Sequence, residues 1–254
     1  MKGPARVIGA LTRRALHEIL RVPGAAIPGI LAPTIFMLGI SSVFGAAVHL
    51  PGFGTTDFRA FVVPVGFLQS ASFAGAATGV NLARDIEHGW FDRLLLCPTP
   101  RVVLLGGIVS SASLRALLPS SFLLAVALGL GVRFPGLLGI ILAALLVMGL
   151  AMAVAFYAVL IALHFRTQQA APLMQIGGFI LVLFTTSYAP QQLLTGWLRT
   201  VSRINPVTHV LTGVRQGFVG DVTWTATWPA IASVAGMLLV LGALATRALL
   251  RTGA

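Results

Sequence analysis

Charged side chains are scarce in this sequence. Only 9% of its 254 residues are Asp, Glu, Lys or Arg, whereas a soluble domain carries about 25%. With so few charges the chain cannot cover a water-facing surface, which excludes an ordinary soluble globular protein. Its apolar runs are long enough to cross a bilayer, which takes about 20 residues per helix. Because these runs do not alternate between polar and apolar residues, they predict membrane-spanning helices and not the strands of a β-barrel.

Only six residues are acidic, and none of them lies inside an apolar run. Ion-coupled carriers usually bind their ion through a carboxylate within the membrane, so this absence argues against a secondary transporter. Lys2 is the only lysine, and without a G-x-x-x-x-G-K-[ST] motif the chain cannot build a P-loop for ATP. Neither H-E-x-x-H nor G-x-S-x-G occurs, so nothing indicates an intramembrane protease or a lipase.

Cysteine and histidine are also too few or too scattered to build a site. Cys97 is the only cysteine, which excludes a disulfide within the chain. The five histidines are widely spaced, and we predict no metal site. The net charge of +11 comes from basic residues that lie mostly at the ends of apolar runs. There they set topology and contact anionic lipids, so we expect membrane lipids and no nucleic acid as partners.

The apolar runs predict an all-α polytopic membrane protein with a single transmembrane domain over residues 1–254. We expect six transmembrane helices, at Ala25–His49, Ala60–Ala83, Val102–Val132, Pro135–Leu163, Ala171–Tyr188 and Trp224–Leu250. Eleven Lys and Arg residues fall on the side that would hold both termini, and five fall on the other. The excess of basic residues places both termini in the cytoplasm.

Two segments outside these runs are amphipathic. Residues 5–21 predict an interfacial helix lying in the headgroup plane, although an ordinary basic flank that sets orientation is the alternative. Residues 189–223 are too apolar for a free external loop. They predict two short helices, separated at Asn205–Pro206, that re-enter or cap the outer leaflet. The alternative is a pair of surface helices with no gating role.

The stretch 84–97 gathers charges of both signs between two apolar runs. Asp85 to Leu96 can form a short helix with Ile86, Trp90 and Leu94 on one stripe. An apolar stripe rimmed by mixed charges, in a cytoplasmic loop, is typical of a docking element for a soluble protein. A helix at headgroup level with no partner is the alternative, although its acidic residues would face anionic lipid poorly.

Two motifs carry a resemblance to a known family. "RDIEHGWFDRLLLCPTPRVVLLGG" resembles the cytoplasmic loop of ABC transporter type-2 permeases, and "INPVTHVLTGVRQGF" is similar to the Asn-Pro segment before their last span. Within that family the chain looks closest to the daunorubicin-resistance type. One position departs from the pattern: Trp90-Phe91 stand where the family commonly has a small or polar residue before a leucine.

The resemblance implies a membrane subunit in the bacterial inner membrane that exports a hydrophobic or amphipathic drug or lipid. It implies a second permease subunit, identical or homologous, and two copies of a separate ABC ATPase subunit. ATP and Mg would bind that ATPase, with no cofactor in this chain. His164–Gln169 would be a second, smaller cytoplasmic contact. The coupling helix that docks on the ATPase would contain Arg84, Asp85, Glu87, Gly89, Trp90, Phe91, Asp92, Arg93 and Leu94.

Polarity alone suggests the remaining candidates. Gln69, Ser72 and Asn81, together with Arg115, are candidates for the substrate pathway, while Asn205, Pro206 and Arg215 are candidates for an outer gate. Arg115 has an alternative interpretation, in which it extends to the cytoplasmic headgroups. A self-sufficient channel or facilitator would need a polar stripe such as the one in the second run, but hydrogen bonding between helices explains that stripe more simply. An integral membrane enzyme lacks any catalytic constellation.

Overall fold

The computed structural model describes residues 9–10, 13–14, 23–50, 52–53, 55–96 and 99–251, and these residues form helices and turns without a strand. The predicted interfacial helix at 5–21 lies mostly outside them. The elements are α2 (Pro23–Phe44), η1 (Gly45–His49), α3 (Phe58–Glu87), α4 (Trp90–Leu95), α5 (Arg101–Gly129), α6 (Gly136–Phe165), η2 (Gln168–Ala170), α7 (Ala171–Leu183), α8 (Gly196–Ile204), α9 (Pro206–Val219) and α10 (Trp224–Arg251).

Five helical segments of the described chain are long and apolar enough to cross a membrane: α2 with η1, α3, α5, α6 and α10. They match five of the six predicted spans in position and length. The other, Ala171–Tyr188, is not a helix of spanning length, because α7 ends at Leu183 after 13 residues. The hydroxyls of Thr185 and Ser187 each donate to the carbonyl of Val182 at 2.7 Å. Such local bonds compete with the helical pattern and end it.

Helix α3 lies at the centre of the bundle, and α2, α5, α6, α7 and α9 all pack against it. Gly75 and Gly79 let α3 approach α6 closely. A Cβ added at Gly75 would lie 2.7 Å from the carbonyl oxygen of Ala151, and one at Gly79 would lie 2.7 Å from the carbonyl carbon of Ala158. Small residues four apart are a common device for packing membrane helices. The long, mostly buried α3 therefore serves as the axis of the fold.

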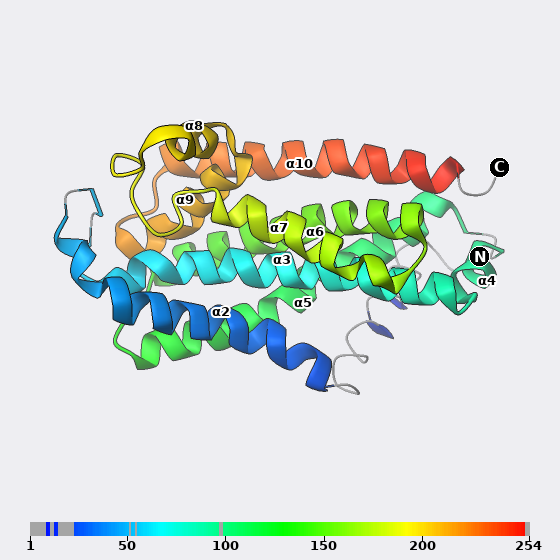
Figure 1. Ribbon diagram of the computed structural model, residues 1–254, viewed down its shortest axis with the longest axis horizontal. Helices are drawn as coiled ribbons and strands as arrows, with labels where there is room; N and C mark the ends of the chain where they lie inside the picture. The colour runs from blue at the N-terminus through cyan, green and yellow to red at the C-terminus, as the bar shows by residue number, and fades with distance from the viewer. Residues whose placement is uncertain are drawn as a thin grey trace.

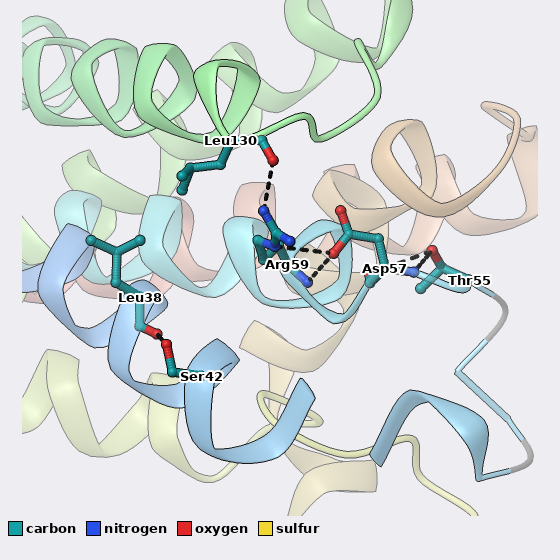
Figure 2. Close-up of polar contacts among 6 residues, drawn as sticks. All are labelled: Leu38, Ser42, Thr55, Asp57, Arg59 and Leu130. Atoms are coloured by element: carbon teal, nitrogen blue, oxygen red, sulfur yellow. Dashed lines mark hydrogen bonds and ion pairs between the residues drawn. The ribbon is translucent and has the colours of Figure 1, made fainter. Parts of the chain in front are cut away.

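The bundle has two distinct ends. The C-terminal end of α3, together with α4, lies at the same end as the last turns of α10, whereas α8 and α9 lie at the opposite end (Figure 1). We call these the α4 end and the α9 end. At the α4 end, Arg101 donates to the carbonyl of Leu250 at 3.2 Å. At the α9 end, Arg59 at the start of α3 donates to the carbonyl of Leu130 at 2.6 Å (Figure 2).

Large apolar side chains remain exposed along the outside of the bundle. Examples are Ile35 and Phe36 on α2, and Trp228, Leu239 and Leu244 on α10. So many large exposed apolar side chains indicate contact with a membrane or another protein. With five helices of spanning length, they identify the chain as a multi-pass membrane protein.

Candidate functional sites at the two ends of the bundle

The predicted coupling segment is not one helix. Its first residues belong to the last turn of α3, which continues to Glu87. Gly89 then adopts a left-handed backbone with φ +68°, and α4 starts at Trp90. A left-handed residue suits glycine, which has no Cβ to clash. The single helix expected from Asp85 to Leu96 is therefore wrong, because this glycine breaks it into two pieces.

The apolar stripe of the segment faces the chain's own bundle. Ile86 and Phe91 are buried, and Trp90 and Leu94 are half-buried. The bundle thus covers Ile86 of the predicted docking stripe, whereas Trp90 and Leu94 stay partly accessible, and a docking role for the stripe stays a prediction. The exposed face is polar and ends in an apolar tip. It consists of Glu87, His88, Asp92, Arg93 and Leu96, the last of which is 86% exposed.

The turn between α6 and α7 braces this exposed face. One carboxylate oxygen of Glu87 accepts from the Thr167 hydroxyl at 2.7 Å and from the Gln168 amide N–H at 2.9 Å. Its other oxygen accepts from the Gln168 side chain at 2.6 Å. Arg166 reaches Asp92 of α4 at 3.6 Å. Two segments about eighty residues apart in sequence thus form one polar surface. This surface includes part of His164–Gln169, the second cytoplasmic contact that the family resemblance implies.

A described residue of the N-terminal segment joins the same cluster. Arg14 donates to Asp85 at 3.0 Å, and its guanidinium carbon lies 3.7 Å from the centre of the Trp90 ring. A cation over an indole face is an attractive pair. Trp90, the departure from the family pattern, therefore contacts its own chain. Arg84 of the predicted site is half-buried in the last turn of α3.

At the α9 end, Asn205 joins α7 to α9. Its side-chain oxygen accepts from the Val207 N–H at 3.0 Å and so caps α9, with Pro206 in the first turn. Its side-chain nitrogen donates to the carbonyls of Leu181 at 2.7 Å and Phe184 at 3.1 Å. The last carbonyls of a helix have no partner within it, so one amide satisfies the ends of two helices. The predicted helix break at Asn205–Pro206 is confirmed.

Arg215 on α9 is a buried cation, only 9% exposed. Its Nε donates to the carbonyl of Phe61 on α3 at 3.0 Å, and one Nη donates to the carbonyl of Ser187 at 3.2 Å. Its guanidinium carbon also lies 3.6 Å from the centre of the Phe61 ring. A buried charge is costly unless it is hydrogen-bonded. Arg215 thus ties α9 to the start of α3 and to the turn after α7.

Sequence reasoning missed the turn that Arg215 and Asn205 hold. Thr185, Thr186 and Ser187 are all buried, and the hydroxyls of Thr185 and Ser187 lie 2.7 Å apart. The signal was the run of three hydroxyl residues at the end of an apolar segment. Such residues favour turns over a helix interior.

The pathway candidates lie against α7 or inside the bundle. Gln69 donates to the Tyr188 hydroxyl at 3.3 Å, and the Ser72 hydroxyl lies 3.4 Å from the carbonyl of Gly178. Both side chains are buried, while Asn81 is half-buried. Arg115 is 8% exposed, so its side chain does not extend to the surface as the alternative interpretation expected. In this conformation Gln69 and Ser72 hold α7 to α3, and a pathway role stays a prediction.

Comparison with known proteins agrees with these features. The family model described as ABC-2 type transporter matches residues 6–219. The chain is 24% identical over 236 residues to the daunorubicin resistance ABC transporter permease protein DrrB1 of Streptomyces coeruleorubidus, covering 92% of this chain and 82% of the relative. It is 24% identical over 227 residues to the doxorubicin resistance ABC transporter permease protein DrrC of Mycobacterium tuberculosis, covering 85% and 81%. It is also 24% identical over 208 residues to the transport permease ycf38 of Cyanophora paradoxa, and this match covers 81% of this chain and 71% of the relative.

The helical bundle and the matched region together define a membrane transport permease. The chain belongs to the ABC-2 type transporter family.

Proposed function

We propose that this chain is the membrane subunit of an exporter that moves a hydrophobic or amphipathic compound, a drug or a lipid, out across a bacterial inner membrane. Two copies of a separate ABC ATPase bind ATP and Mg and drive it, and a second permease subunit completes the pathway. Relatives named for daunorubicin and doxorubicin resistance support this substrate class. The α4 end faces the cytoplasm, as the excess of basic residues indicates.

One observation carries the proposal: the braced polar surface at the α4 end. Asp92, Arg93 and Leu96 are exposed there, and the contacts of Glu87 to Thr167 and Gln168 hold the neighbouring turn in line with them. A soluble partner can bind such a surface through both signs of charge around an apolar anchor. We assign the ATPase contact to this composite surface, with Ile86 and Phe91 as its internal support.

The α9 end supplies the outer closure. Asn205 and Arg215 fix the turn after α7, so that turn can open outward only when these hydrogen bonds break. We propose that α7 with this turn forms the sixth crossing and that α8 and α9 cap the outer leaflet. Non-helical backbone at membrane depth is tolerated where the surrounding protein buries it. Thr185–Ser187 are buried by the surrounding helices in this way.

Co-purification tests the docking surface. The tagged chain is expressed in its native host, and wild type is compared with the double variant Arg93→Glu/Leu96→Asp. We expect a soluble ATPase to co-purify with wild type and to be lost with the variant. The matched control is Arg247→Glu, a charge reversal at an exposed position of the same end, which should retain the ATPase.

The outcome decides between two functions. Recovery of no ATPase from wild type, in several detergents and with nucleotide present, would contradict the exporter. If the double variant retains the ATPase, the docking surface lies elsewhere on the chain. The alternative function, a self-sufficient channel or facilitator, predicts solute flux from liposomes that contain this chain alone.

A further inference from the structure

A groove with a cavity volume of about 80 Å³ opens on the side of the bundle between α5 and α6. Its inner wall includes Phe67 of α3 and Phe218 of α9, whose rings meet edge to face with their centres 5.7 Å apart. Ser121 and Ala144 line its outer part, where Ser121 is exposed and Ala144 is half-exposed. The groove is therefore reachable from outside the bundle and closed at its base by the seam of α3 and α9.

The groove lies at the depth of one leaflet. Ile140, which lines it, is four residues from the start of α6, and Val147 is eleven residues from it. At about 1.5 Å per residue the groove runs from roughly 6 to 16 Å below the α9 end of that helix. A hydrocarbon core is about 30 Å thick, so one leaflet takes about half of it. The groove thus opens to the acyl-chain region of the leaflet at the α9 end.

The side chains that line the groove offer no free hydrogen-bond donor. The Ser120 hydroxyl donates to the carbonyl of Ala116 at 2.8 Å, and the Ser121 hydroxyl donates to the carbonyl of Leu117. The other lining side chains are hydrocarbon. A polar ligand would leave its own hydrogen bonds unmade there, which is unfavourable. The groove therefore fits a hydrocarbon chain.

Two glycines explain why Phe218 reaches the groove. A Cβ added at Gly217 of α9 would lie 3.0 Å from the Cα of Gly139 on α6. The two helices can therefore cross almost in backbone contact, which brings the residue after Gly217 to the inner wall. Arg215 lies about one turn before Phe218 on the same helix. A chain in the groove would press on the helix that carries the outer closure.

An exposed cation lies in the connection that leads into α6, on the α9 side of the groove-lining residues of that helix. Arg133 lies in the short connection between α5 and α6, seven residues before Ile140, and its side chain is exposed. Among the described residues it has no ion-pair partner. A basic residue at the headgroup level attracts an anionic lipid.

From this geometry we infer that the groove binds one acyl chain of an anionic phospholipid from the leaflet at the α9 end, with the phosphate of that lipid near Arg133. The bound chain packs against Phe67 and Phe218 and stiffens the seam that Arg215 spans. This site requires neither the ATPase nor a transported substrate.

Photo-crosslinking tests the inference. The purified full chain is placed in phosphatidylcholine nanodiscs that contain a trace of phosphatidylglycerol with a photoreactive acyl chain, and labelled residues are mapped by mass spectrometry. We expect labelling to concentrate on the groove, and Ala144→Trp, which fills it, to abolish that labelling. Ala235→Trp makes the same change at an exposed position of α10 and should leave it intact. If Ala144→Trp does not fold, Ser121→Trp replaces it in the experiment, because it fills the groove from the α5 wall.

A second arm tests the headgroup. Arg133→Gln should lower the preference for phosphatidylglycerol over phosphatidylcholine about fivefold. Labelling spread evenly over α2, α10 and the groove, and unchanged by either tryptophan on α5 or α6, would overturn the site. Protein–protein cross-links from the groove to a second copy would overturn it too, because the groove would then be a subunit interface. Neither result bears on ATPase co-purification.

Discussion

Around α4, Asp85 and Asp92 are bound by exposed arginine side chains, whereas at the α9 end Asn205 and Arg215 are buried side chains that bind mainly backbone carbonyls. The Arg14 and Asp85 side chains are 44% and 20% exposed, and those of Arg166 and Asp92 are 54% and 62% exposed. In contrast, Asn205 and Arg215 are almost completely covered. Both ends connect segments that are distant in sequence, but they do so with different chemistry.

This difference fits two mechanical roles. Exposed ion pairs are worth about 0–1 kcal/mol and weaken as salt rises. Such contacts can rearrange when a partner binds. Buried hydrogen bonds from a charged group are worth about 1.5–3 kcal/mol each, and breaking them leaves unsatisfied groups. The α9 end is therefore built to hold one shape, and the α4 end is built to adapt.

Arg215→Gln should produce the largest loss of stability. It removes the charged donor to Phe61 and Ser187, and we expect a loss of about 3 kcal/mol. The thermal midpoint of the purified chain in detergent measures it. Arg203→Gln, at an exposed position of α8, is the control and should leave the midpoint unchanged. Equal midpoints for the two variants would show that the buried contacts do not hold the α9 end.

Asn205 allows its two roles to be separated. Asn205→Ala loses both the cap of α9 and the bonds to the carbonyls of Leu181 and Phe184, so we expect a loss of about 2 kcal/mol. Asn205→Asp keeps the acceptor that caps α9 but cannot donate to α7. Its second carboxylate oxygen would face those carbonyls in a buried place, so its midpoint should fall at or below that of Asn205→Ala in the same thermal assay. If the aspartate matches wild type, the link to α7 contributes nothing.

Much of the bundle could be predicted from the sequence because hydropathy alone determines a spanning helix. The five long runs needed no knowledge of their neighbours, and their predicted limits lie within a few residues of the helices, apart from Ala60–Ala83, which α3 extends by one turn to Glu87. The break at Asn205–Pro206 was also readable, since proline disfavours helical backbone in the preceding residue. The end of α7 was missed, although the three hydroxyl residues at 185–187 are a local signal for it, because hydropathy alone continues the apolar run to Tyr188.

The candidate site was harder to predict. The sequence places charged and apolar residues on two faces of 84–97 but does not say which face the bundle covers. Ile86 and Phe91 are covered because the chain turns back at Gly89. The brace from Glu87 to Thr167 and Gln168 joins segments eighty residues apart, a pairing that no local pattern reveals. The roles of Asn205 and Arg215 were suggested only by polarity, and their partners came from the structure.

Glu87→Lys should loosen the α4 end without unfolding the chain. The lysine cannot accept from Thr167 and Gln168, so the turn between α6 and α7 loses its brace. We expect faster hydrogen–deuterium exchange in residues 164–170 and an unchanged thermal midpoint. Arg93→Glu, a charge reversal on the same surface, is the control for a general electrostatic effect. Unchanged exchange in Glu87→Lys would mean that the brace does not order the turn.

The smallest expected effect is that of the Arg14–Asp85 pair. A double-mutant cycle with Arg14→Gln and Asp85→Asn should give a coupling energy below about 1 kcal/mol. That energy should shrink as ionic strength rises, because exposed charges are screened. The loss in Arg215→Gln should stay constant over the same range, since its contacts are buried and end on neutral carbonyls. If the Arg14–Asp85 coupling exceeds the Arg215→Gln loss, or resists salt, the contrast between an adaptable α4 end and a fixed α9 end fails.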